Sequence, residues 1–241
     1  MLASGQLMAG AFCFLEGGAI WWGKWGRKDA FPGADGSTTT QERTYQNATT
    51  IPIYGADGTT KLPEDGTGYR KISITTAGVL NGNTSKIYSI KFPLTFITSS
   101  SDWYTNNQNF QNDALWNDGS LAKSNYDPCP KGWITPPDGT WGDFSITTFL
   151  YYIQGKQITS GNNTCQNGRV YDNIAWYPAA GHRPCTGGLL AHVGYSGYYW
   201  SSTADIVDTG ACRINFNMST IDRLTKAPNR GQGFSIRCIQ E

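Results

Sequence analysis

The chain has 241 residues, a formal net charge of +1, and few charged residues (15%). This length is long for one domain and short for two, and mixed or all-β folds of this size often form a single unit. A charge near zero gives no electrostatic reason to expect nucleic acid or an anionic membrane as a partner. No apolar run reaches the length that spans a bilayer, so we expect no direct membrane span. Abundant glycine, threonine, serine, asparagine and aromatic residues are typical of an extracellular β-rich protein with long loops.

The first twenty residues are mildly apolar but lack a basic region and contain Glu16, so we do not interpret them as a signal peptide. Three tryptophans among glycines, at positions 21, 22 and 25, predict a strand edge that packs on a sheet. Turn signals dominate residues 34–70, which predicts an elaborated loop with short strands. Alternating apolar residues between 70 and 98 predict further strands.

Two prolines flank Cys129, which excludes a helix there and predicts an extended segment. Asp138 is a possible helix cap, and the apolar spacing after it predicts a helix that continues to Ile153. Beyond Gly155 we expect only strands and loops.

The last quarter of the chain is the most informative part. Residues 177–181, 197–203 and 233–239 combine aromatics, glycines and small hydroxyls, as a tightly packed β framework requires. The segments between them follow neither the period of a helix nor that of a strand. A stiff scaffold that carries irregular loops is typical of recognition surfaces, so the pattern favours binding over catalysis.

Metal and catalytic motifs are weak or absent in the sequence. A metal at His182 and His192 would need further ligands such as Asp205 or Asp208, and two exposed loop histidines explain the pattern more simply. No Gly-x-Ser-x-Gly, His-Glu-x-x-His or P-loop motif occurs, so we expect neither an enzyme nor a cofactor. The six cysteines form no Cys-x-x-Cys pair, which makes a structural zinc site improbable.

Six phrases appear in a fixed order, at residues 25–32, 115–116, 126–133, 177–183, 197–203 and 233–239. Together they resemble the major paralogous, C-type-lectin-like domains of surface and fimbrial-tip proteins of Bacteroides-type bacteria and Fibrobacter. The resemblance implies an α+β, C-type-lectin-like fold: small antiparallel sheets with one or two helices, long loops, and paired N- and C-terminal strands. It implies a single domain over residues 1–241, with an insertion at about 34–110. It also implies a Cys129–Cys238 disulfide and leaves Cys13, Cys165, Cys185 and Cys212 unassigned.

The last quarter, about 178–235, also resembles the variable proteins of diversity-generating retroelements. In those proteins, errors at adenines turn asparagine codons into many residues, but never into Glu, Gln, Lys, Met or Trp. Nineteen loop residues here are reachable in this way, so the resemblance implies that they contact ligand, whereas Met218, Lys226 and Gln232 are not reachable and would have to be fixed by the template. The nineteen residues are His182, Pro184, Cys185, Thr186, Ala191, His192, Tyr195, Ser196, Asp205, Ile206, Val207, Asp208, Cys212, Arg213, Ile221, Asp222, Arg223, Leu224 and Thr225.

We therefore expect an extracellular, cell-surface or virion-displayed binding protein with diversified loops. Its expected partner is a host or bacterial surface protein or glycan, with other pilus or virion subunits as further partners. The alternative is a pilus-tip or surface adhesin subunit with a fixed protein or glycan partner. A third hypothesis, a formylglycine-forming enzyme that uses Cys185 or Cys212, lacks a matching motif.

Overall fold

The structure, a computed structural model, describes residues 21–32, 60–63, 70–79, 83–116, 123–152, 168–188, 191–192, 194–205, 210–217, 219–227 and 229–241. In these ranges there is one α-helix, α1 (Asn83–Lys91), and two 3-10 helices, η2 (Gln108–Phe110) and η3 (Asp138–Trp141). The strands before residue 153 are β1 (Trp21–Lys24), β2 (Ala30–Pro32), β3 (Arg70–Ser73), β4 (Thr95–Thr98), β5 (Trp133–Ile134) and β6 (Phe149–Tyr152). The later strands are β7 (Gly168–Tyr171), β8 (Ala175–Pro178), β9 (Gly197–Asp205), β10 (Gly210–Phe216), β11 (Ile221–Ala227), β12 (Gly233–Phe234) and β13 (Ile239–Gln240).

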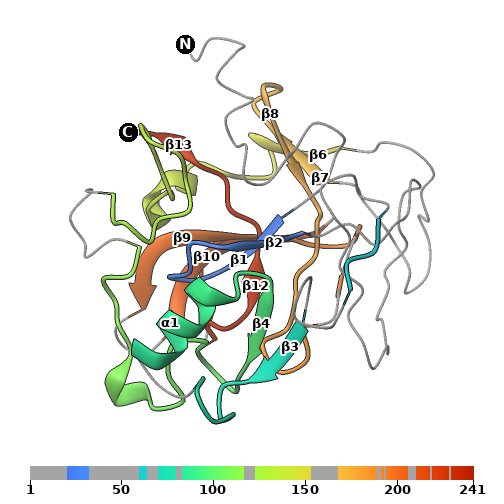
Figure 1. Ribbon diagram of the computed structural model, residues 1–241. Coiled ribbons are helices and arrows are strands. Elements are labelled where there is room, and N and C mark those ends of the chain that lie inside the picture. The colour runs from blue at the N-terminus through green and yellow to red at the C-terminus, as the bar shows by residue number, and fades with distance from the viewer. Residues whose placement is uncertain are drawn as a thin grey trace.

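These strands form several small sheets. Three of the sheets have three strands each, in the orders β12-β1-β2, β11-β10-β9 and β6-β7-β8, and all of their pairs are antiparallel. Two further pairs are β13-β5, which is antiparallel, and β3-β4, which is parallel. Figure 1 shows β9 and β10 in the middle of the molecule, with α1, β3 and β4 on one side and β6 to β8 on the other.

Strand β9 is buried on both faces and separates two apolar clusters. Tyr198 and Trp200 belong to the cluster that also contains Trp25 and Phe234. Tyr199, between them in sequence, packs in the other cluster. Successive side chains of a strand point to opposite faces. The aromatic run in β9 therefore reflects a strand that is covered on both sides, as continuous apolar runs in strands generally do.

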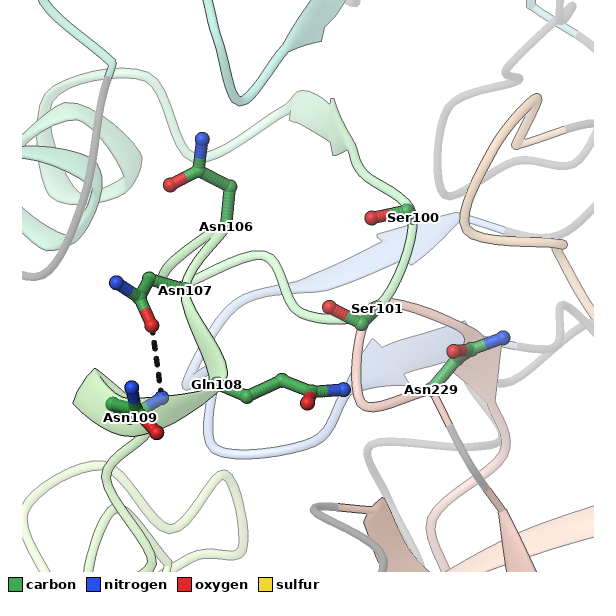
Figure 2. Close-up of a pocket in the computed structure, with 7 residues that line it drawn as sticks. All are labelled: Ser100, Ser101, Asn106, Asn107, Gln108, Asn109 and Asn229. Atoms are coloured by element: carbon green, nitrogen blue, oxygen red, sulfur yellow. Dashed lines mark hydrogen bonds between the residues drawn. The ribbon is translucent and has the colours of Figure 1, made fainter.

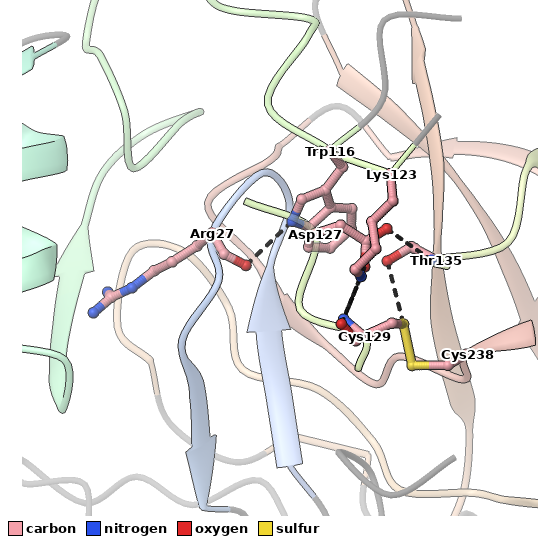
Figure 3. The surroundings of a disulfide bond; sticks show 7 residues. All are labelled: Arg27, Trp116, Lys123, Asp127, Cys129, Thr135 and Cys238. Carbon is pink, nitrogen blue, oxygen red and sulfur yellow. Dashed lines mark hydrogen bonds and ion pairs between the residues drawn. A yellow bond between two sulfur atoms is a disulfide. The ribbon is translucent and has the colours of Figure 1, made fainter. Parts of the chain in front are cut away.

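The segment around Cys129 has turns on both sides and a bend at the cysteine, and Asp127 holds it in place (Figure 3). This buried carboxylate accepts the backbone N–H of Cys129 at 2.8 Å and that of Thr135 at 2.9 Å. Lys123 pairs with the same carboxylate at 2.8 Å. The structure contains the Cys129–Cys238 disulfide, which joins residues 109 positions apart in the sequence. The Asp127 carboxylate thus holds the segment locally, and the disulfide anchors it to the end of the chain.

The expected α+β, C-type-lectin-like fold is wrong. About 10% of the described residues are helical and 35% are in strands, and the structure is mostly small antiparallel sheets with a single α-helix in the described ranges. The last strand, β13, pairs with β5, whereas β1 pairs with β12.

The helix expected from Asp138 to Ile153 is also absent from its described part. Four residues form η3, and the chain then turns and enters β6. The turn is stabilised by Ser145, whose hydroxyl accepts the backbone N–H groups of Thr147 and Thr148 at 3.2 Å each. Such local side-chain bonds compete with helical backbone bonds, which explains why the apolar spacing did not produce a helix.

Strands β3 and β4 are strands, as expected, but the residues between them include α1 rather than a further strand. Parallel strands require a crossover connection, and α1 lies in it. The helix buries Ser85 and Ser89 and exposes 51% of Ile87 and 63% of Ile90. Two serines of the helix therefore face the protein while two isoleucines face solvent, which is the reverse of the usual pattern at these positions of a surface helix.

Candidate binding site

The irregular segment between β8 and β9 is pinned at its base by backbone hydrogen bonds. His182 and Ala191 exchange two such bonds at 2.9 Å each, and Arg183 exchanges two with Gly233 at 2.9 and 2.8 Å. The backbone N–H of Gly181 donates to the carbonyl of Ser196 at 2.8 Å. Main-chain groups carry these bonds, and the buried Arg183 side chain adds one more by donating to the carbonyl of Gly188 at 2.7 Å.

The two histidines of this segment meet at the ring of Tyr198 in β9. The ring centroid of His182 lies 4.7 Å from that of Tyr198 and 5.2 Å from that of His192. The Nδ1 atom of His192 lies 3.2 Å from the Tyr198 hydroxyl. Tyr195 lies beside His192, with ring centroids 5.8 Å apart. His192 has a φ of +60°, a left-handed conformation that turns the chain here.

Strand β10 places Arg213 against the ring of Tyr198 as well. Its guanidinium carbon lies 5.1 Å from the ring centroid of Tyr198 and 5.1 Å from that of Phe234, within range of cation–π attraction. In the sheet register Asn215 faces Tyr198, and Asp222 of β11 faces Asn215. We define the Tyr198 cluster as His182, His192, Tyr195, Tyr198 and Arg213.

Within this cluster, the His182 imidazole is held in its uncharged form. Burial, together with His192 and Arg213 nearby, lowers the pKa of His182 from 6.5 to about 3. Burial also lowers the pKa of Arg213, against the opposing effects of Tyr198 and Asp222. His182 is therefore an uncharged imidazole at neutral pH. Tyr198 itself is buried, so the parts of the cluster that reach the surface belong to its half-buried members, which are two histidines, Tyr195 and Arg213. Imidazole, phenol and guanidinium groups suit non-covalent recognition.

The structure places the other predicted contact residues of this segment differently. Thr186 is exposed and Pro184 is half-buried. Cys185, Ala191 and Ser196 are buried, so their side chains have little surface to offer a ligand. The carbonyl of Cys185 accepts the backbone N–H of Ser99 at 3.0 Å, which ties the segment to the end of β4.

A second group lies at the far end of β9. Asp205 is buried and forms an ion pair with Lys226 at 3.0 Å, and Cys212 faces Lys226 in the sheet register. Asp205 is seven residues beyond Tyr198, roughly 23 Å at about 3.3 Å per residue. Burial raises the pKa of the Cys212 thiol, as it does that of Cys185, so both thiols are protonated at neutral pH. These residues do not join the Tyr198 cluster.

In β11, Ile221 is half-buried against the second apolar cluster, and Asp222 and Arg223 are exposed. Leu224 and Thr225 lie in the same strand, but their side chains are outside the described part. Residues Ile206, Val207 and Asp208 also lie outside the described residues.

The sequence analysis missed Tyr198 as part of the site, because it stands in a phrase that we assigned to the framework. The available signal was the strand period, which puts Tyr198 on the opposite face of β9 from Tyr199. Among the described residues, no group of three or more His, Cys, Asp or Glu side chains could hold a metal ion. In the same ranges no helix has the length and apolarity to cross a membrane.

In comparisons with known proteins, no family model, no curated protein and no solved structure matches this chain. The arrangement of the site therefore has to be interpreted from its own residues.

Proposed function

We propose that this is a ligand-binding protein of a cell surface or a virion, with the Tyr198 cluster as its contact surface. The cluster would contact a protein or glycan on another surface by shape and hydrogen bonding, without chemistry. Its aromatic and guanidinium groups are of the kind that dominates binding energy in protein interfaces. Tyrosine in particular provides contact area at a low cost in conformational entropy.

Side chains from separate segments of the chain lie together in this cluster, and this carries the proposal. His182, His192, Tyr195 and Arg213 occupy positions whose identity the secondary structure does not dictate, and they come from segments up to 31 positions apart (213 − 182). Three of them, His182, His192 and Arg213, nevertheless contact Tyr198. Tyr195 lies against His192. Chance placement of irregular residues would scatter them over the surface.

A second observation supports diversification of these positions. The backbone bonds at the base of residues 181–196 do not depend on side-chain identity. His182, Tyr195 and Arg213 are half-buried, so exchanges there meet partial rather than complete packing constraints. We therefore propose that the protein is the variable target of a diversity-generating retroelement.

The test is to sequence the DNA around the segment that encodes residues 182–225 in many isolates. The proposal predicts a near-copy of that segment that differs only at adenines, beside a reverse transcriptase gene. It also predicts that the codons for the Tyr198 cluster vary except at Tyr198 itself. Uniform codons at His182, His192, Tyr195 and Arg213, with no near-copy, would overturn diversification and leave a fixed partner.

A protein-level test separates binding from diversification. A displayed library that randomises His182, His192, Tyr195, Arg213 and Asp222 can be selected against streptavidin as a neutral target. We expect most members to fold and some to bind. The control library randomises Tyr199, Ile214 and Phe216, which are buried in the second cluster, and we expect its members to unfold. Equal loss of folding in both libraries would show that the cluster is core rather than contact surface.

A further inference from the structure

A polar cleft lies away from the Tyr198 cluster, next to the end of β4. Its volume is about 760 Å³, within the range of small-molecule sites. All seven lining residues are neutral and carry a hydroxyl or an amide: Ser100, Ser101, Asn106, Asn107, Gln108, Asn109 and Asn229. Figure 2 shows the two serines on one side, the residues around η2 on the other, and the Gln108 side chain reaching across toward Ser101 and Asn229.

Both walls of the cleft are held by hydrogen bonds. On one side, the carbonyl of Ser101 accepts the backbone N–H of Gly231 at 2.9 Å, which fixes the turn that carries Asn229. On the other side, the Asn107 side chain caps η2 by accepting the backbone N–H of Asn109 at 3.0 Å. Hydrogen bonds therefore fix the positions of the segments that form the two walls of the cleft.

The cations behind the cleft are already engaged. Arg230 is buried, pairs with Asp113, and donates from Nε to the carbonyl of Gly210 at 2.7 Å. Lys24 is buried and donates to the carbonyls of Ile97 and Gly231 at 2.6 Å each. Neither charge lines the cleft, so its chemistry is that of neutral donors and acceptors.

We propose that this cleft binds a neutral oligosaccharide, without a metal ion and independently of the Tyr198 cluster. Amides and hydroxyls each donate and accept hydrogen bonds, which matches adjacent sugar hydroxyls that do the same. An uncharged lining gives no preference for acidic sugars or for nucleotides. Phe110, which follows the lining residue Asn109 in η2, is 66% exposed.

The experiment titrates the full chain with maltotriose, cellotriose, mannotriose and triacetylchitotriose, using calorimetry and saturation-transfer NMR. We expect at least one of them to bind, equally well with and without EDTA. Sialyllactose and a heparin tetrasaccharide serve as charged comparisons, and we expect them to bind more weakly. Stronger binding of a charged sugar, or no binding of any neutral trisaccharide, would overturn the proposal.

Variants locate the binding. Gln108→Ala with Asn109→Ala removes two exposed amides and spares the capping Asn107, and we expect binding to weaken tenfold or more. Ser101→Leu fills the cleft from the opposite wall and should abolish binding. The control Asn125→Ala removes an exposed amide elsewhere and should change nothing. Circular dichroism checks that each variant is folded.

A second pair of variants separates this cleft from the proposed contact surface. His192→Ser and Arg213→Ser should leave the titration unchanged. If they abolish sugar binding while the cleft variants do not, the sugar is a ligand of the Tyr198 cluster and the cleft proposal fails. If neither set matters, binding lies elsewhere and the cleft proposal fails as well.

Discussion

The Nδ1 atom of His192 and the hydroxyl of Tyr198 lie 3.2 Å apart, and this pair joins the segment before β9 to the strand itself. A single side-chain hydrogen bond of this kind contributes about 0.5–1.5 kcal/mol to stability. We predict that Tyr198→Phe lowers the free energy of unfolding by about 1 kcal/mol while the ring keeps its packing against Phe234. A double-mutant cycle with His192→Ala isolates the bond, and a coupling energy near zero would show that the contact is incidental.

Stability should depend on pH through His182. Its pKa in the folded protein is about 3 and its ordinary value is 6.5, so the unfolded state takes up the proton at higher pH. The stabilisation from the neutral imidazole is therefore complete above pH 6.5 and is lost as the pH falls toward 3. Between about pH 7 and pH 5 we expect the free energy of unfolding to fall by about 1–2 kcal/mol from this group.

The comparison that isolates this effect is His182→Gln, measured by urea denaturation at both pH values. Between these two pH values, the free energy of unfolding of the variant should fall less than that of the native protein. Burial raises the pKa of Asp102 to about 6, so Asp102 acts in the opposite direction in the same range, but equally in both proteins. NMR provides a second readout, since the His182 ring signals should not titrate above about pH 4.5. Identical pH slopes, or a titration at the ordinary histidine pKa, would refute the assignment.

Gly197 should be intolerant of any side chain. A Cβ atom on it would lie 2.1 Å from the ring of Phe216, its partner in the sheet register. Overpacking of this kind costs about 1–3 kcal/mol, so Gly197→Ala should lower the midpoint of denaturation clearly. Gly139→Ala is the matched control, because a methyl group added at Gly139 would have open space within 4 Å. Partial recovery in Gly197→Ala with Phe216→Leu would confirm that the clash is the cause.

Part of this fold could be predicted from the sequence. The phrase at residues 197–203 combines a close-contact glycine with an aromatic run, and it forms most of β9. The segment around Cys129 contains no helix, as its prolines require. In both places local sequence and tertiary packing favour the same conformation.

The rest depends on contacts that local patterns do not encode. Ile87 and Ile90 suggested a strand, but they lie on the exposed side of α1 while Ser85 and Ser89 face the protein. In the binding site, the meeting of His182, Arg213 and Tyr198 depends on the register of β9 and β10, which the sequence does not reveal. Tertiary packing decided both outcomes.

The Cys129–Cys238 disulfide should be a major source of stability. It joins residues 109 positions apart, and a cross-link of that span typically contributes about 2–5 kcal/mol, largely by restricting the unfolded chain. We predict that Cys129→Ala with Cys238→Ala lowers the melting temperature markedly. Dithiothreitol should lower the melting temperature of the native protein and leave that of the double variant unchanged. The control Cys212→Ala removes a thiol outside any disulfide and should keep the response to the reductant.

Because α1 buries serines and exposes isoleucines, we expect a serine of this helix to matter more for stability than an isoleucine. Ser85 is fully buried, and its hydroxyl donates to the carbonyl of Tyr104, which ties the helix to the segment after β4. Ser85→Ala should therefore lower the free energy of unfolding by about 1 kcal/mol or more, since it removes this bond inside the protein. Ile87 is half exposed, so Ile87→Ser should change stability by no more than about 0.5 kcal/mol. An amphipathic helix of the ordinary orientation would give the opposite ranking. Urea denaturation of the two variants decides between them, and a larger loss in Ile87→Ser would show that α1 packs through its isoleucines.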